Sequence, residues 1–116
     1  KLAPHDALRD TARAVADAGA DAITLIAPPA ALAVDPGAGA QTAMRLSGPA
    51  IRPIALQAVA DVASAVSIPV VGCGGITSAD EARQFLAVGA QAVQVGAALL
   101  ADPYAAVRIA DALEAG

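Results

Sequence analysis

The sequence predicts an α/β fold in which parallel strands are covered by helices. Segments rich in helix formers alternate with short runs of β-branched residues along the whole chain. The strand-like runs are largely apolar, which is typical of parallel strands that are buried on both faces. In addition, the turn Ala18-Gly-Ala-Asp-Ala-Ile23 is echoed by Val88-Gly-Ala-Gln-Ala-Val93, so the same helix-to-strand junction occurs twice.

The boundaries of the elements follow from local signals. Asp6 and Asp102 are expected N-caps, Ser78–Glu81 is a capping box, and Gly19 and Gly89 are expected to end helices. The expected elements are, in order, a strand end at residues 1–4, a helix at 6–18, a strand at 21–26, a loop at 27–48, a helix at 51–65, a strand at 68–71, a helix at 78–87, a strand at 92–95 and a helix at 103–113.

This order predicts part of a (β/α)8 TIM barrel. Such a barrel needs about 250 residues, whereas this chain has 116 residues and three complete strands. We therefore interpret residues 1–116 as three to four βα units, the C-terminal half of a single barrel domain. Because the chain begins at Lys1, we also expect it to be a fragment, which on its own would leave two sheet edges open.

The composition excludes several classes of protein. With 57% hydrophobic and 16% charged residues, the chain is too apolar to be disordered. A net charge of −4 and the lack of a Lys/Arg cluster argue against a nucleic-acid partner. A single cysteine rules out a disulfide framework, and no metal site is expected. The apolar runs are shorter than the roughly 18 residues of a membrane helix, so we expect a cytoplasmic protein without a membrane partner.

Three glycine-bearing segments follow expected strands or precede helices, namely 46–48, 72–75 and 96–97. In parallel α/β sheets, ligands bind beyond the carboxyl ends of the strands, where glycine lets the backbone approach them. Free N–H groups at such junctions attract phosphate. The glycines could instead serve only to make tight turns. Phosphate binding is the favoured interpretation because two consecutive βα junctions carry the feature.

The sequence resembles the C-terminal half of the dihydroorotate dehydrogenases. The resemblance rests on three segments: Leu46-Ser-Gly-Pro-Ala-Ile-Arg-Pro-Ile-Ala-Leu56, Ile68-Pro-Val-Val-Gly-Cys-Gly-Gly-Ile76 and Gly89-Ala-Gln-Ala-Val-Gln-Val-Gly96. Residues 1–4 and 19–24 match as well, so nearly the whole chain is covered. The cytosolic class 1 enzymes look closest, and the flavin half of dihydropyrimidine dehydrogenase is also similar.

The resemblance implies an FMN-dependent oxidoreductase of pyrimidine biosynthesis, which oxidises dihydroorotate to orotate and passes the hydride to the flavin. In this family, the lysine that matches Lys1 reaches the flavin ring, and the glycine-bearing junctions hold the phosphate. The residues implied to bind FMN are Lys1, Ile26, Gly48, Gly74, Gly75, Gly96 and Ala97. The open sheet edges of a half-barrel predict a homodimer, and the resemblance suggests an iron–sulfur electron-transfer subunit as a further partner.

Several positions depart from the family pattern. Ala27 and Pro28 stand where the family carries an Asn-Thr pair that binds the substrate ring, and Ala97 stands where threonine is common. The family's general base lies on a loop upstream, so no catalytic residue is expected within this chain. Cys73 is expected to be a small buried hydrophobe, and His5 a surface residue.

Two further functions stay open on the sequence alone. The first is a TIM-barrel enzyme without flavin, which binds a phosphorylated metabolite through the same junctions. The second is a catalytically inactive half-barrel that serves as a binding or assembly piece. The segment 46–49, Leu-Ser-Gly-Pro, argues against the first of these, because a generic phosphate site does not require it.

Overall fold

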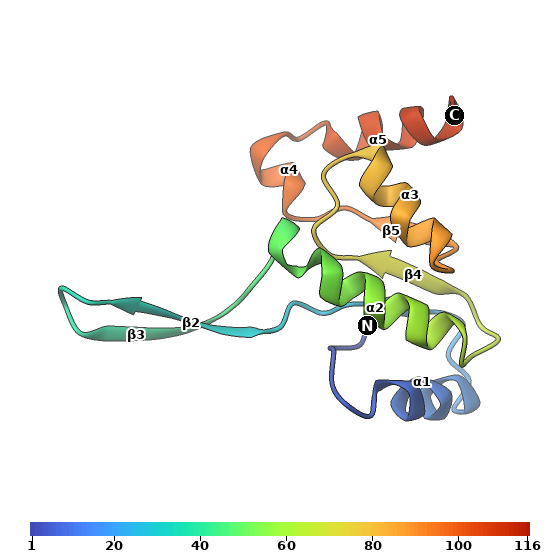
Figure 1. The fold of residues 1–116 in the computed structure, drawn as a ribbon, viewed down its shortest axis with the longest axis horizontal. Coiled ribbons are helices and arrows are strands. Elements are labelled where there is room, and N and C mark those ends of the chain that lie inside the picture. The colour runs from blue at the N-terminus through green and yellow to red at the C-terminus, as the bar shows by residue number, and fades with distance from the viewer.

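A computed structural model describes residues 1–116 and shows a parallel sheet with helices along one side (Figure 1). The sheet has three strands in the order β1-β4-β5, with the bounds Ile23–Leu25, Val70–Cys73 and Ala92–Gln94. Leu2 forms a parallel bridge to Leu25, so the start of the chain lies alongside the free edge of β1. The strands therefore neighbour one another in chain order, as consecutive βα units of a barrel do.

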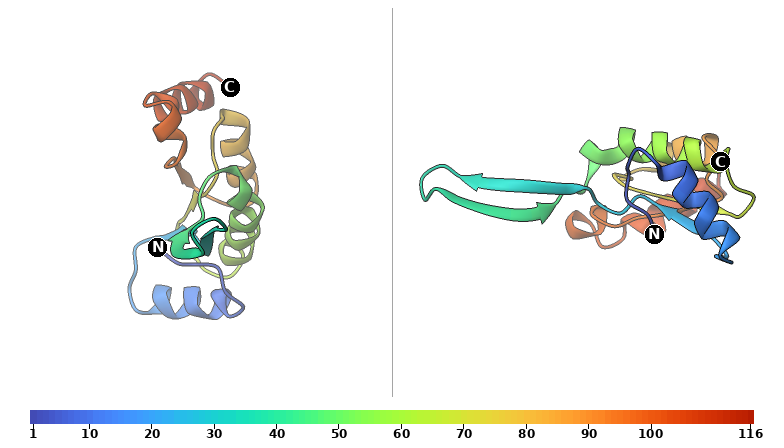
Figure 2. Two further views of the ribbon diagram at one scale, coloured as in Figure 1. Left: turned by 90° about the vertical axis from the view of Figure 1, so that its left-hand side faces the viewer. Right: turned by 90° about the horizontal axis from the view of Figure 1, so that it is seen from below.

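The helices follow one another along an arc outside the sheet (Figure 2). They are α1 (Leu8–Asp17), the 3-10 turn η1 (Pro49–Ile51), α2 (Arg52–Ala63), α3 (Ala79–Ala87), the short α4 (Ala98–Ala101) and α5 (Ala105–Glu114). The predicted alternation of helix and strand is confirmed, and what is present is part of a barrel. None of the helices has both the length and the apolar character needed to cross a membrane.

Two of the predicted helix starts are wrong, whereas the capping box is confirmed. Ser78 and Glu81 each accept a backbone hydrogen bond at the start of α3. Asp6 does not cap α1, because the preceding turn is closed by the backbone N–H of Leu8, which donates to the carbonyl of His5 at 3.1 Å. Asp102 accepts from the N–H of Tyr104 at 2.9 Å and so caps a turn that precedes α5.

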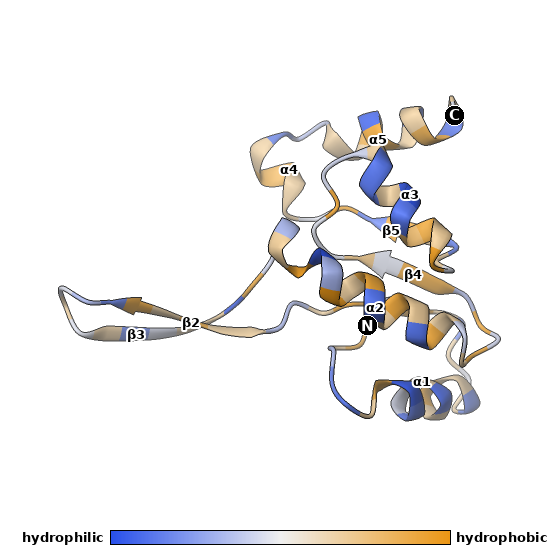
Figure 3. Cartoon of the chain, in the orientation of Figure 1, coloured by the Kyte–Doolittle hydropathy of each residue, from blue (hydrophilic) through white to orange (hydrophobic).

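The prediction of a loop at residues 27–48 is also wrong, because most of this segment forms an antiparallel hairpin. Its strands are β2 (Ala30–Asp35) and β3 (Ala40–Arg45), and they extend away from the body of the molecule (Figure 1). The Asp35 carboxylate accepts hydrogen bonds from the N–H groups of Gly37 and Ala38, at 2.8 and 3.2 Å, and so fixes the turn. Figure 3 shows apolar stretches within this hairpin. Leu32 and Val34 of β2 are among its exposed residues.

The core lies between the helices and one face of the sheet. Phe85 of α3 is fully buried over Gly72 of β4, where a Cβ atom would lie only 2.5 Å from the Phe85 ring. Leu25 and Gly72 lie on the face of the sheet that the helices cover. Thr24, Val71 and Cys73 lie on the opposite face and are only half-buried. The helices thus cover one face of the sheet and not both, as suits part of a barrel whose other face is its interior.

Candidate functional site

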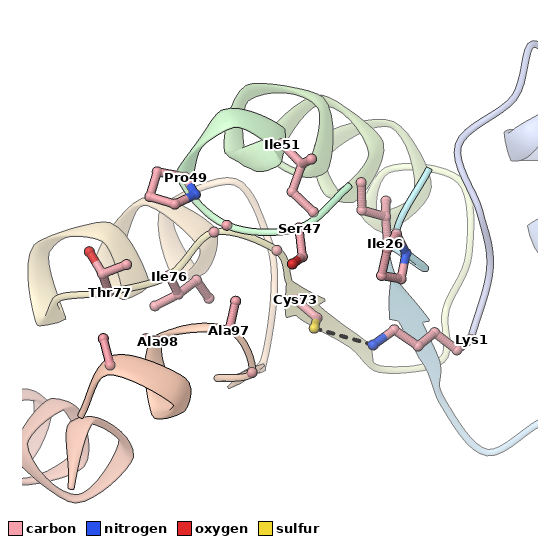
Figure 4. A pocket seen from close by; sticks show the side chains of 16 residues that line it. Lys1, Ile26, Ser47, Pro49, Ile51, Cys73, Ile76, Thr77, Ala97 and Ala98 are labelled. Carbon is pink, nitrogen blue, oxygen red and sulfur yellow. Dashed lines mark hydrogen bonds between the residues drawn. The ribbon is translucent and has the colours of Figure 1, made fainter. Parts of the chain in front are cut away.

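A cavity of about 320 Å³ opens at the carboxyl ends of β1, β4 and β5 (Figure 4). It is bordered by the start of the chain, by the loop that leads into η1, and by the junctions that follow β4 and β5. All the residues predicted to bind a cofactor line this cavity: Lys1, Ile26, Gly48, Gly74, Gly75, Gly96 and Ala97. The structure therefore brings them together, and their role in binding FMN stays a prediction.

One end of the cavity is rich in free backbone donors. The N–H groups of Gly75, Ile76, Gly96 and Ala97 donate no hydrogen bond to the rest of the chain. These residues come from the two junctions after β4 and β5, which lie next to each other because the two strands pair. A group of free N–H donors on one wall of a cavity is suited to an anionic ligand.

The glycines of this wall differ in what they contribute. Gly74 and Gly75 have φ angles of 141° and 70°, a backbone region that favours glycine, so tight turning alone accounts for both. A Cβ atom at Gly75 would also lie 2.6 Å from the carbonyl oxygen of Gly48. Gly96 is different, because its φ angle lies outside that region and a Cβ atom there would meet nothing within 4 Å. Packing within the chain therefore does not account for Gly96.

Lys1 and Cys73 lie at the other end of the cavity. The Lys1 ammonium group donates to the Cys73 sulfur at 3.3 Å, and Figure 4 shows these side chains pointing toward one another, away from Thr77 and Ala98. The prediction that Cys73 is fully buried is wrong: it is half-buried and lines the cavity. The reason is its register, because it follows Gly72 on β4 and so points to the uncovered face of the sheet.

Several lining residues were not singled out from the sequence. Thr77, Ser47 and Ile76 contribute to the walls of the cavity. The signal for Thr77 and Ile76 was their position directly after the Gly74-Gly75 pair. Ile26 and Ile51 are fully buried and add an apolar surface between the two ends of the cavity.

The Glu81 carboxylate ties the junction after β4 to the start of α3. One oxygen, Oε2, accepts from the N–H and the hydroxyl of Thr77 at 2.6 and 2.7 Å and from the N–H of Ser78 at 3.2 Å. The other, Oε1, pairs with Arg52. Burial alone would raise the pKa of Glu81, but the Thr77 hydrogen bonds and the Arg52 charge outweigh this, and the pKa lies below its ordinary value of 4.5.

The remaining candidates lie elsewhere. His5 is exposed, as predicted, and borders a separate groove between α1 and α2. The pairs Asp10–Arg13 and Asp80–Arg83 lie on exposed helix faces, also as predicted. No group of three or more His, Cys, Asp or Glu side chains is arranged to hold a metal ion.

Comparison with known proteins gives consistent results. A sequence model of the family described as dihydroorotate dehydrogenase matches residues 1–116. A putative dihydroorotate dehydrogenase A (fumarate) of Solibacter usitatus is 46% identical over 119 residues, which cover 97% of this chain. The catalytic subunit of dihydroorotate dehydrogenase B (NAD(+)) from Thermodesulfovibrio yellowstonii is 47% identical over 120 residues, or 98% of this chain.

A solved structure has a similar fold. The crystal structure of DHODH from Eimeria tenella in complex with ferulenol matches with a TM-score of 0.75 over 90% of this chain and 29% of its own. Its sequence identity is 22%, so the likeness concerns the fold. The chain spans 39% of the length of the two curated relatives. On the match of the family model to the entire chain, the protein belongs to the dihydroorotate dehydrogenase family.

Proposed function

We propose that this chain forms the FMN-binding part of an oxidoreductase that converts dihydroorotate to orotate. The observation that carries the proposal is the convergence of Lys1, the apolar Ile26 and the two glycine-bearing junctions on one cavity. These segments are far apart in the sequence, and only the fold brings them together. The relatives that share almost half of their aligned residues with this chain are named for dihydroorotate oxidation, which supports the same substrate here.

The residues at the two ends of the cavity are suited to the phosphate and to the ring system of FMN. The phosphate of FMN is a dianion, and the free N–H groups of Gly75, Ile76, Gly96 and Ala97 would bind it. Ile26 and Ile51 border the middle of the cavity, where an apolar wall is suited to a flat ring. The Lys1 ammonium would place a positive charge beside the ring system and so stabilise negative charge there. When bound, FMN supplies the hydride acceptor of the reaction.

Substrate recognition in this chain must differ from the family pattern. Ala27 and Pro28 have no side-chain donor or acceptor, so they cannot hold a polar ring as an Asn-Thr pair does. We propose that hydrogen bonds to dihydroorotate, and the general base, come from parts of the protein outside this chain. The chain itself would then supply the cofactor's phosphate site and the lysine.

We further propose a cytoplasmic homodimer that transfers electrons to an iron–sulfur subunit. Open sheet edges favour a dimer, and the name of the Thermodesulfovibrio yellowstonii relative, a catalytic subunit, supports the idea of a second subunit.

The test is to purify the protein expressed from its own gene and to measure bound flavin. Native mass spectrometry and the visible absorption spectrum should give one FMN per subunit, and anaerobic addition of dihydroorotate should bleach the flavin bands. A protein that binds FMN but is not bleached would remove dihydroorotate as the substrate. A protein that binds no flavin, even after incubation with excess FMN, would contradict the proposal as a whole.

A further inference from the structure

We propose that Arg52 and Glu81 are positioning residues, which hold the turn Gly74–Thr77 in the form that presents its N–H groups to a phosphate. The inference rests on the proposed function, because it assigns the phosphate of FMN to this turn. Neither side chain lines the cavity, so both would act through the turn and not by touching the ligand.

The two side chains connect three segments of the chain. Arg52 lies in the first turn of α2, donates to the carbonyl of Gly75 at 3.1 Å and pairs with Glu81. Glu81, in the first turn of α3, accepts the N–H and hydroxyl of Thr77. The turn after β4 is thus held on its outer side at two successive points, Gly75 and Thr77.

The contact with Gly75 determines which way the next peptide group faces. In a trans peptide the carbonyl of Gly75 and the N–H of Ile76 point in opposite directions. Because Arg52 binds that carbonyl, the N–H of Ile76 points away from Arg52, and Ile76 lines the cavity with this N–H unpaired. With the peptide reversed, a carbonyl oxygen would replace this N–H and would repel an anion.

This turn needs external support because it contains two consecutive glycines. Gly74 and Gly75 lack side chains that would restrict their backbone, so their peptide groups reorient more easily than others. Arg52 and Glu81 are well placed to prevent this, since their side chains are only 24% and 19% exposed. By contrast, the side chains of Arg83 and Asp80 on the same helix are 45% and 89% exposed, and their ion pair is accessible to water.

The test compares FMN with riboflavin, which has the same ring and lacks the phosphate. Flavin is removed from the protein expressed from its own gene, and the Kd of each flavin is measured by quenching of flavin fluorescence. For Glu81→Gln and Arg52→Met, we expect the Kd of FMN to rise about tenfold or more, since a hydrogen bond to a charged group is lost. The Kd of riboflavin should change less than about twofold.

Two variants serve as controls. Asp80→Asn removes a carboxylate from the neighbouring position of α3 and should change neither Kd. Arg52→Lys keeps a positive donor and should restore most of the preference for FMN. Equal losses for both flavins in Glu81→Gln and Arg52→Met would show a general structural role and would overturn the inference, as would an unchanged ratio of the two Kd values.

Thr77→Val provides a second test if Glu81→Gln and Arg52→Met do not fold. It removes the exposed hydroxyl that donates to Glu81 and leaves the ion pair intact, so we expect a smaller loss in the same direction. Thr77→Ser should behave like the wild type. If the wild-type protein binds both flavins equally well, the inference fails and the proposed flavin function stands. If it binds neither flavin, both fail.

Discussion

At the scale of single residues, Lys1 is the only charged side chain on the cavity wall. Replacing it with methionine keeps most of the length and removes the positive charge that we propose lies beside the flavin ring. We expect flavin reduction by substrate to slow about 100-fold, because a fixed charge at the reacting group is lost. Stopped-flow absorbance measures the rate. Arg9→Met on the exposed face of α1 is the control, and an unchanged rate in Lys1→Met would contradict the role of the lysine.

A substitution at Gly96 should change ligand affinity without lowering stability, unlike a substitution at Gly75. An alanine there meets no atom within 4 Å, so the midpoint of thermal unfolding should not fall. Its methyl group would nevertheless occupy the wall beside a free N–H, and we expect the Kd of FMN to rise about tenfold. Gly75→Ala should lower both stability and affinity, because its Cβ atom would strike Gly48. Gly37→Ala in the hairpin turn is the control.

Glu81 also predicts how stability depends on pH. Since its pKa in the folded protein lies below the ordinary value of 4.5, the folded state favours the ionised form. The stabilisation is fully present above pH 4.5 and is lost as the pH falls through the lowered pKa. Urea unfolding between pH 7 and pH 3 should therefore show a shallower decline for Glu81→Gln than for the wild type. Asp80→Asn should retain the wild-type slope.

At the scale of elements, the hairpin of β2 and β3 is independent of the body. The two strands pack on each other and project away from the sheet, and Ala30 lies opposite Arg45 where the hairpin begins. Replacing residues 31–44 with Asn-Gly should therefore leave a closed turn and shift the midpoint of thermal unfolding by less than about 3 °C. Loss of a cooperative transition, monitored by circular dichroism, would show that the hairpin supports the core.

The elements that were predicted correctly from sequence depend on local signals. Gly19, with a φ angle of 97°, and the Ser78–Glu81 box end and start their helices through contacts within a few residues. The hairpin was missed because its strands are rich in alanine, which has little strand preference, and its prolines and glycines resemble those of a loop. Asp6 and Asp102 lie one and two residues before the observed N-caps, Ala7 and Tyr104, because a separate turn is closed before each helix.

In the candidate site, too, some residues could be predicted from local sequence signals, and others are brought together only by the fold. The glycines and Lys1 could be predicted because their residue types and their neighbours along the chain carry the family pattern. The pairing of Arg52 with Glu81 could not, because 29 residues separate them and only the packing of α2 beside α3 brings them together. Likewise, the half-buried position of Cys73 depends on strand register, which one sequence specifies only through the pattern of burial.

At the scale of the whole molecule, no single βα unit contains the site. Lys1 precedes the first helix, Ile26 follows β1, and the glycine-bearing junctions follow β4 and β5. The cavity exists only while these strands remain paired in order, so a bound ligand should stabilise the sheet as well as occupy the cavity. The uncovered face and the β5 edge are where we expect the remainder of a longer protein to pack.

The close approach of Gly75 to Gly48 limits which segments can be exchanged between this protein and its relatives in chimeras. The two loops lie in close contact, since a Cβ atom on Gly75 would strike the carbonyl oxygen of Gly48. Neither can therefore be replaced alone by a segment of different shape. We expect chimeras that receive only residues 46–53 or only residues 72–77 from a divergent relative to lose flavin binding. A chimera that receives both segments from the same donor should keep it, because these two stretches of sequence form a single inherited module.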